Sequence, residues 1–572
     1  MIVNDSPITN NPATQLDSKY RPIVKAIFLA VICVSVYLPA MQGGFIWDDD
    51  TTLTENPVLK EYGLYRCWFT IEQPNYWPIT WMTYRLEYEL WGLNPTGYHI
   101  TNILIHTACA LLIWRILILL KIPAAWLAAI IFAVHPVNVE SVAWIAQRKT
   151  LLAMLFFLIT ILLYLKFEGS NDFLFYWLSA AAFALAMLSK GSVVGLPIVL
   201  LLLAWRQKGT ITRNDLLRSL PFFTISAVMS GVELWFQVYR SIGPVAIRGD
   251  NFFARTAGAG MAVWFYIYKA ILPINLVFIY PRWKIDPTNL IVYVPLIALI
   301  GAFLLFWRYR QSWGKQLLFA LSYYVVMLLP ILGFFNIFFM RYSLVADHYQ
   351  YAAIISIIVL AVSGGRLITY QFGRAGKMAA VIIVAVFGVI TWQQCYIYKD
   401  EEISWNSTLR KNPNCGLALN NLGFLLQRQG RLDEAIDRFE QLLRIEPNDI
   451  DAQTNLGNTL AQQGKFDEAI KHYQKVTELE PDNADIYYNL GNTFRAQGKT
   501  DMAIEAYNRA VMLDSDYLEA HYNAALILQS QGRFDEAIRH WREVLRIMPG
   551  NMGAHNNLRK IIDAQNEKFA PN

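Results

Sequence analysis

Three consecutive acidic residues, Asp48, Asp49 and Asp50, follow the first apolar segment and are the first candidates for chemistry. They lie in a stretch, 43–98, that is rich in Trp, Tyr and Pro, a composition typical of helices at a membrane surface. A carboxylate at that depth could act as a general base, taking a proton from an acceptor hydroxyl that attacks a lipid-linked donor. Two other interpretations remain open: a solvated acidic turn that caps the next helix, and a site for a hard cation.

A second group of polar residues follows the third apolar segment. His135 precedes a proline, and Glu140, Trp144 and Arg148 then recur every four residues, so a helix would place these three along one face. An acid, an aromatic ring and a base on one face suit contact with a sugar and a phosphate. The alternative is an ordinary helix surface.

A third group lies between Arg341 and Tyr349 and includes Asp347 and His348. The group lies at an outer loop of the topology described below, but a histidine alone is more often a structural hydrogen-bonding residue than a catalyst.

The elements that must position these groups are apolar segments. The chain of 572 residues is 55% apolar and only 16% charged, against about 25% charged residues in a soluble domain. Runs of 15–21 apolar residues are near the length that crosses a bilayer. We expect eleven spans, at 24–41, 100–120, 124–136, 150–167, 173–189, 191–205, 219–239, 290–306, 316–333, 350–364 and 378–394.

Charge sets the orientation of these spans. Four strongly basic loops, around 19–25, 206–218, 308–315 and 366–377, fall on one side if the run 257–280 does not cross. This run contains two prolines, which fits a re-entrant or surface-lying segment. The tail 1–23 is then cytoplasmic, and both the loop 43–98 and the C-terminal region face the periplasm of a bacterium or the lumen of the endoplasmic reticulum.

This topology leaves several cations on the outer side. They could be side chains that extend to the interface from span ends, or together they could form a site for a lipid phosphate. The set is Arg85, Arg148, Lys149, Lys190, Arg240, Arg248, Arg255 and Arg341.

The C-terminal region, 399–572, is a repeat array. Glycine recurs every 34 residues at Gly430, Gly464, Gly498 and Gly532, and small residues and prolines recur at the same period. This period is typical of the tetratricopeptide repeat (TPR), in which pairs of helices stack into a solenoid. We expect four repeats at about 416–549 and a capping helix at about 552–566.

One asparagine column in the array could bind a ligand. Equivalent positions on the first helices of stacked repeats line the concave face, where amides could hold an extended peptide. The alternative is that asparagine is simply common at this position and caps local turns. The column is Asn421, Asn455, Asn489 and Asn523.

Together, these motifs resemble the TMTC family, the transmembrane and TPR-containing O-mannosyltransferases. The resemblance rests on the Gly44-Phe45-x-x-Asp48-Asp49 segment, on ordered motifs around Trp77-Pro78, His99 and His135-Pro136, on Ser189-Lys190, and on the Arg341–Tyr351 segment. It covers most of the chain, including the order of membrane part and repeats. One departure is Gly191, where the family commonly has an acid, so no role is assigned to that position.

The resemblance implies a GT-C glycosyltransferase domain at 24–398, in which Asp48 or Asp49 is the base. It also implies that a donor-binding set contacts a polyprenyl-phosphate sugar. That set is Arg85, His99, His135, Glu140, Arg148, Lys149, Lys190, Arg341, Asp347 and His348. The short repeat array suggests a bacterial member, whose donor and acceptor can differ from those of the animal proteins.

The expected activity is inverting transfer of a hexose, such as mannose, to Ser or Thr hydroxyls of proteins, with no metal or other cofactor. The net charge of +5 is too dispersed to predict nucleic-acid binding. Two alternatives are a transferase acting on a lipid or polysaccharide, and a non-enzymatic membrane-anchored TPR scaffold. The large acid-bearing loop argues against a scaffold, because one span would suffice as an anchor.

Overall fold

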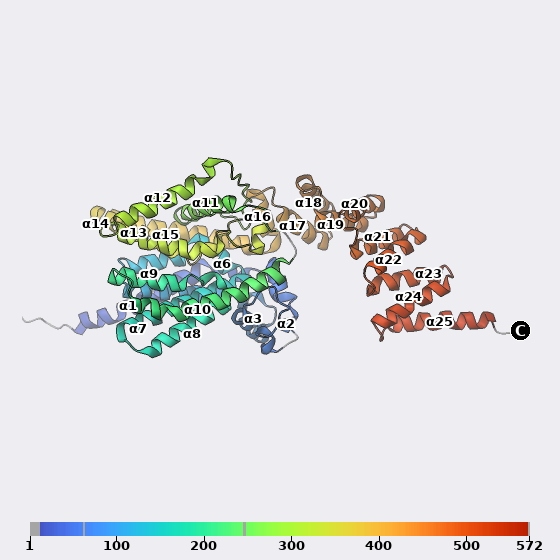
Figure 1. Cartoon of the computed structure of the whole chain (residues 1–572), viewed down its shortest axis with the longest axis horizontal. Coiled ribbons are helices and arrows are strands. Elements are labelled where there is room, and N and C mark those ends of the chain that lie inside the picture. The colour runs from blue at the N-terminus through green and yellow to red at the C-terminus, as the bar shows by residue number, and fades with distance from the viewer. Residues whose placement is uncertain (1–11, 61–62, 244–246, 570–572) are drawn as a thin grey trace, which may run out of the picture. The chain divides into compact units, whose positions relative to one another are not determined.

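The computed structural model describes residues 12–60, 63–243 and 247–569, with the side chains of all but 12–20, 366–372 and 564–569. Every regular element in these ranges is a helix (Figure 1). The chain divides into two compact units, Met1–Asn412 and Pro413–Asn572. The predicted fold class is confirmed: apolar membrane-type helices are followed by a helical repeat array. Residues 1–11 of the predicted N-terminal tail lie outside the described residues.

Within the described residues, seven helical segments are long and apolar enough to cross a membrane. Their main helices are α4 (Pro95–Leu119), α7 (Arg148–Ser170), α9 (Leu196–Lys208), α10 (Arg213–Phe236), α12 (Val294–Arg308), α13 (Gly314–Leu328) and α15 (Arg374–Cys395). An eighth candidate is α5 (Ala125–Ala133) with Pro136–Ala143, a pair bent by 48°. The shorter helices α8 (Phe173–Ser189) and α14 (Ile354–Phe372), together with α1 (Pro12–Val36), overlap the other expected spans.

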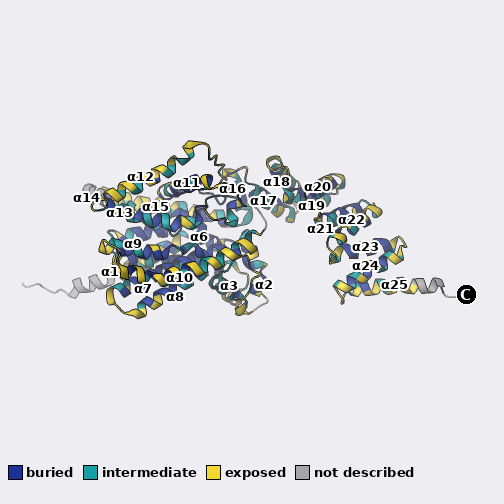
Figure 2. Ribbon diagram, in the orientation of Figure 1, coloured by how far each residue is buried: buried dark blue, intermediate teal, exposed yellow. Residues whose placement is uncertain are grey.

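Apolar side chains cover the outer faces of some of these helices. Ile297 on α12 is 64% exposed and Val381 on α15 is 68% exposed, and Figure 2 shows further exposed residues along both helices. Large apolar side chains exposed along a whole helix face are expected where lipid, rather than water, is the surrounding solvent. The chain is therefore an integral membrane protein.

Helix α11 (Phe252–Ile271) covers the first part of the run 257–280, whose crossing the sequence left open. It is not among the candidate spans. Arg255 near its start donates to the carbonyl of Gly333, just after α13, at 3.3 Å. Trp264 in its second half donates to the carbonyl of Pro295, at the start of α12, at 2.8 Å. The end of α13 and the start of α12 lie at one end of this antiparallel pair, so these contacts favour a helix that lies at that end rather than one that crosses.

The described residues of the stretch 43–98 form a packed substructure of short helices that includes α3 (Pro78–Trp91). Its core contains Leu53, Val58, Trp81 and Tyr84, which pack against Ile145 at the start of the α7 segment. This packing gives the acidic triplet a rigid support.

Helix α16 (Glu401–Lys411) belongs to the membrane unit. Lys411 donates to the carbonyl of Leu276 at 2.6 Å, and Asn412 donates to the carbonyl of Ile279 at 3.2 Å. These bonds attach the last helix of the unit to the extended segment that follows α11.

The repeat unit consists of four antiparallel helix pairs and a last helix. The pairs are α17 (Gly416–Arg428) with α18 (Leu432–Ile445), α19 (Ile450–Gln462) with α20 (Phe466–Leu479), α21 (Ala484–Ala496) with α22 (Thr500–Leu513), and α23 (Leu518–Ser530) with α24 (Phe534–Ile547), followed by α25 (Met552–Phe569). A β-carbon on Gly457 would lie 2.6 Å from the Tyr473 ring, and one on Gly491 would lie 2.5 Å from Tyr507. These glycines therefore let the paired helices approach closely.

Candidate functional site

The three acids after the first span have different environments, and Asp49 is the buried one. Its two carboxylate oxygens accept hydrogen bonds from the backbone N–H groups of Ile46, at 2.9 Å, and Ala146, at 2.7 Å. Burial raises the pKa of Asp49 well above its usual value, although these two hydrogen bonds act in the opposite direction. Asp49 thus joins the acidic loop to the segment before α7. Each of its two carboxylate oxygens already accepts one of these backbone hydrogen bonds.

Asp48 is much more accessible than Asp49. Its side chain is 41% exposed, and one oxygen lies 3.4 Å from the Nζ of Lys149. The third acid, Asp50, accepts a hydrogen bond from the Thr54 hydroxyl at 2.8 Å within the short π-helical turn Asp50–Thr54. Of the two predicted catalytic acids, Asp48 is therefore the more accessible, and Asp49 is bonded to backbone N–H groups on both oxygens.

The residue before Asp48 is held in a strained backbone conformation. Trp47 has φ = 45°, a left-handed value that is costly for a bulky residue. Its N–H donates to Glu401 of α16 at 2.8 Å, and its ring stacks on Trp144 with centroids 5.5 Å apart. It also packs edge-on against Trp405. These contacts fix the direction in which the next residue, Asp48, leaves the backbone.

Lys149, at the start of α7, lies beside Asp48, and Lys190, just after α8, lies near Lys149. The Nζ of Lys149 is 4.6 Å from the ring centroid of Trp77, which makes a cation–π contact. Lys190 donates from Nζ to the Thr150 hydroxyl at 3.0 Å. Burial, and next the nearby Lys149, lower the pKa of Lys190 to about 7. Two cations held near one another in this way form a favourable site for an anion.

Glu233 belongs to this group, and the sequence motifs did not single it out. Its Oε1 accepts hydrogen bonds from the Trp77 indole N–H, at 3.2 Å, and from the backbone N–H of Gly191, at 3.3 Å. A signal was available: Glu233 is the sole acidic residue in the predicted span 219–239, and an ionisable residue within a span is by default a functional candidate.

Glu140, Asp347 and His348 form a buried layer behind Trp144. His348 donates its backbone N–H to Glu140 at 2.9 Å, and its Nδ1 also lies 2.9 Å from that carboxylate. Tyr280 donates its hydroxyl to Asp347 at 3.0 Å. Burial raises the pKa of Asp347 and lowers that of His348, so both groups favour their neutral forms. The layer supports the loop before α14. The hydrogen bonds of these three side chains described above all join one part of the protein to another.

Arg148, next to Lys149, is completely buried and engaged. Its guanidinium donates to Glu87 at 2.8 Å, to the carbonyl of Tyr98 at 2.9 Å and to the side chain of Asn102. All three nitrogens are used within the protein. The structure therefore does not bring this residue to Asp48 as a donor-binding group.

Four more of the predicted donor-binding residues have contacts with other protein groups. Arg85 bonds to the carbonyl of Leu59 and pairs with Glu89 at 2.9 Å. His135 lies 3.0 Å from the carbonyl of Ala270 and caps a short 3-10 turn. The other two, His99 and Arg341, are respectively buried against Gly43 and exposed beside Tyr342.

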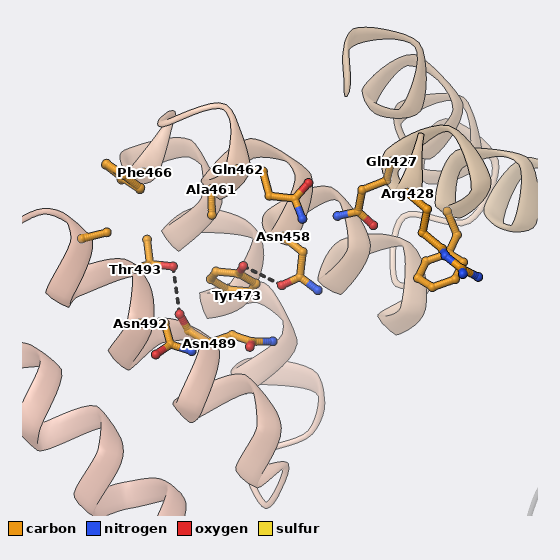
Figure 3. Close-up of a pocket in the computed structure, with 12 residues that line it drawn as sticks. Gln427, Arg428, Asn458, Ala461, Gln462, Phe466, Tyr473, Asn489, Asn492 and Thr493 are labelled. Atoms are coloured by element: carbon orange, nitrogen blue, oxygen red, sulfur yellow. Dashed lines mark hydrogen bonds between the residues drawn. The ribbon is translucent and has the colours of Figure 1, made fainter. Parts of the chain in front are cut away.

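In the repeat unit, a groove of about 510 Å³ opens between successive repeats (Figure 3). Its lining is Phe424, Gln427, Arg428, Asn458, Ala461, Gln462, Phe466, Tyr473, Asn489, Asn492, Thr493 and Ala496. Of the predicted asparagine column, Asn489 lines this groove. The side chains of Asn455 and Asn523 donate instead to Asn420, at 3.1 Å, and to Asn492, at 3.2 Å.

The groove amides of Asn458 and Asn492 are oriented by tyrosines. The hydroxyl of Tyr473 donates to the Oδ1 of Asn458 at 2.7 Å, as the dashed line in Figure 3 shows. Tyr507 donates in the same way to Asn492 at 2.7 Å. Because these oxygens are occupied, the amide nitrogens remain as donors toward a ligand.

Fold and site together define a class: a polytopic helical membrane protein with an acid–lysine site at a span end and a TPR array. The TPR repeat model matches residues 426–464, 457–494 and 491–532, and the tetratricopeptide repeat model matches 518–551. Among solved structures, a crystal structure of MamA aligns with 26% identity, covering 26% of this chain and 82% of that one, at a TM-score of 0.25.

Several relatives are named protein O-mannosyl-transferases. The chain is 23% identical over 481 residues to "Protein O-mannosyl-transferase TMTC3" from Homo sapiens, covering 74% of this chain and 51% of that protein. It is 31% identical over 197 residues to "Protein O-mannosyl-transferase TMTC4" from Homo sapiens, covering 28% and 26%. The TMTC resemblance seen in the sequence is confirmed, and the chain spans about half the length of the curated relatives it matches.

Proposed function

We propose that this protein transfers a hexose, such as mannose, from a polyprenyl-phosphate donor to Ser or Thr hydroxyls of other proteins. The observation that carries the proposal is the contrast within the acidic triplet. Asp48 is exposed and lies beside Lys149, whereas its neighbour Asp49 is buried and bonded on both oxygens. A reachable carboxylate beside one lysine, with a second lysine near the first, is an arrangement that suits an inverting transfer from a phosphodiester donor.

In this proposal Asp48 is the general base. The acceptor hydroxyl attacks the anomeric carbon, the bond from that carbon to the phosphate oxygen breaks, and the hydroxyl proton passes to Asp48. The leaving group is polyprenyl phosphate, whose negative charge grows as the bond breaks. Lys149 and Lys190 stabilise this charge, because preorganised cations need little reorganisation during the reaction. Attack opposite the leaving group inverts the anomeric configuration.

The repeat groove is the proposed acceptor site. Amide donors on Asn458, Asn489 and Asn492 would bond to main-chain carbonyls of an extended segment, which makes recognition tolerant of sequence. The other members of the predicted column, Asn421, Asn455 and Asn523, are not among the residues that line this groove, so the proposal places no peptide contact on them. A double substitution, Asn458→Ala with Asn489→Ala, should raise the KM for a peptide acceptor and leave donor binding unchanged. An unchanged KM would contradict this assignment.

The proposed location is a cellular membrane with the Asp48 loop and the repeats on the outer face. This is the periplasm for a bacterial protein and the lumen of the endoplasmic reticulum for a eukaryotic one. The contacts of α11 support this topology, because the run 257–280 must not cross for the repeats and Asp48 to share a side. Cysteine labelling of the loop 43–98 and of α25 in intact vesicles tests it.

The activity is tested with the full-length protein in proteoliposomes that contain polyprenyl-phosphate mannose, with a Ser- and Thr-containing peptide as acceptor. Asp48→Asn should lower the transfer rate by about 10²–10⁴-fold, the usual contribution of a general base. Asp50→Asn is the matched control and should transfer at close to the normal rate. A normal rate for Asp48→Asn would overturn the assignment of the base. Sugar transfer to lipid but not to peptide would instead support a lipid acceptor.

A further inference from the structure

Glu233 near the end of α10 is held by two donors that come from different parts of the membrane unit. The Trp77 indole precedes α3, and the Gly191 N–H lies between α8 and α9. Both bonds go to Oε1. Among the described residues, no donor bonds to Oε2 of Glu233. One oxygen is therefore fixed, and the other remains able to accept a hydrogen bond.

The fit of this carboxylate depends on the absence of a side chain at position 191. A β-carbon built on Gly191 would overlap Oε2 of Glu233. Any other residue at 191 would displace the Glu233 carboxylate, so the two positions compete for the same space. A glycine here is explained by this close approach, because its backbone does not adopt a left-handed conformation.

The carboxylate borders the proposed donor site. Lys149 lies over the ring of Trp77, whose N–H holds Glu233, and Lys149 also pairs with Asp48. Glu233 and Lys190 attract one another electrostatically. The two lysines are thus flanked by two carboxylates, of which Asp48 is the exposed one and Glu233 the one that is rigidly oriented.

We propose that Glu233 recognises the donor sugar, its Oε2 accepting a hydrogen bond from a sugar hydroxyl while the phosphate contacts the lysines. This inference rests on the proposed function in that it takes the ligand to be a polyprenyl-phosphate hexose. A carboxylate fixed on one oxygen and open on the other is well suited to select a hydroxyl, because a ligand without that hydroxyl leaves the charged acceptor unpaired. Glu233 would then determine which sugar binds.

Binding rather than transfer provides the test, so that failure to modify a peptide and failure of this inference are distinguishable. The full-length protein is titrated with polyprenyl-phosphate mannose, with polyprenyl phosphate alone, and with mannosyl donors that each lack one hydroxyl. The wild-type protein should bind one deoxy donor about ten- to a hundredfold more weakly than the mannosyl donor, as expected for a hydrogen bond to a charged group.

Glu233→Gln should lose this discrimination and bind the mannosyl and deoxy donors with similar Kd, while its Kd for polyprenyl phosphate alone stays unchanged. A uniform loss of affinity for all ligands, or unchanged discrimination, would overturn the proposal.

If the Glu233→Gln variant does not fold, moving the acid to the neighbouring position 191 gives a second test. Glu233→Ala combined with Gly191→Asp should recover at least part of the discrimination, and Gly191→Ala alone should weaken it. The proposal would also be overturned if the double variant recovered no discrimination and Gly191→Ala discriminated as well as the wild type.

Discussion

The repeat unit and the site of the membrane unit are built from contacts of very different sequence range. In the repeats, Tyr473 bonds to Asn458 15 residues away, and Tyr507 bonds to Asn492 at the same separation. Around Asp48, Lys149 is 101 residues away, Trp77 reaches Glu233 across 156, and Trp47 reaches Glu401 across 354. Contacts of the first kind recur as a period in the sequence, whereas those of the second kind leave no local pattern.

The limit of sequence analysis is clearest in the membrane unit, where neighbouring residues of the same charge have different environments. Asp48 and Asp49 are both acids, and Arg148 and Lys149 are both cations, yet in each pair one side chain is accessible or close to Asp48 and the other is enclosed by protein groups. We therefore expect one member of each pair to affect the reaction and the other to affect stability.

The largest effect on stability is expected at Arg148. Arg148→Ala leaves the buried Glu87 carboxylate without its ion-pair partner, which should lower the free energy of unfolding by about 3–5 kcal/mol. Lys149→Ala is the matched control and should fold normally while binding the donor more weakly. Thermal unfolding of detergent-solubilised full-length protein measures the first, and donor titration measures the second. Normal stability of Arg148→Ala would contradict the structural role.

A smaller effect is expected in the repeat unit, where the contact is local and steric. Gly491→Val would drive a side chain into the Tyr507 ring, where even a β-carbon would be at 2.5 Å. Such overpacking should cost about 1–3 kcal/mol and make the array more sensitive to proteolysis. Gly550→Ala, at a glycine with open space around it, should behave like the wild type. Equal protease sensitivity of the two variants would show that the close helix approach does not depend on Gly491.

Asp49→Asn should have an effect of comparable or smaller size. The amide keeps one acceptor but places an NH₂ group against the N–H of Ile46 or Ala146, so one buried donor loses its partner at a cost of about 1–3 kcal/mol. The variant should melt at a lower temperature, yet its folded fraction should transfer sugar at a near-normal rate. Full stability combined with a lost reaction would reverse the roles of Asp48 and Asp49.

These examples show what the sequence can predict here. The eleven apolar segments and the period of 34 were visible because hydrophobicity and repetition are local properties, and each segment coincides with a helix. The sequence predicted only that the acidic loop and Lys149 share one side of the membrane, not that they lie in contact. Which acid is buried depends on the N–H of Ala146, a partner that no spacing rule indicates.

The asparagine column shows the same limit within the repeats. Its period predicts that the four residues occupy equivalent positions, but the neighbours of each differ, so Asn489 lines the groove while Asn455 bonds to Asn420. Glu233 was missed for the opposite reason: it belongs to no motif, and its importance comes from Trp77 and Gly191, which two other segments provide.

An effect of at most similar size is expected from pH and concerns Lys190. Burial, assisted by Lys149, lowers its pKa to about 7, so in the free protein the ammonium is largely present below that pH and is lost above it. A phosphodiester does not titrate in this range, and its negative charge favours the protonated lysine. The affinity for the mannosyl donor should thus be constant below about pH 7 and fall by at most tenfold per pH unit above it. Lys190→Arg remains charged throughout and should abolish the fall, because arginine has a pKa above 12. Donor titrations of both proteins from about pH 6 to about pH 9 make the comparison, and a wild-type affinity that does not change with pH would exclude Lys190 as a phosphate-binding group.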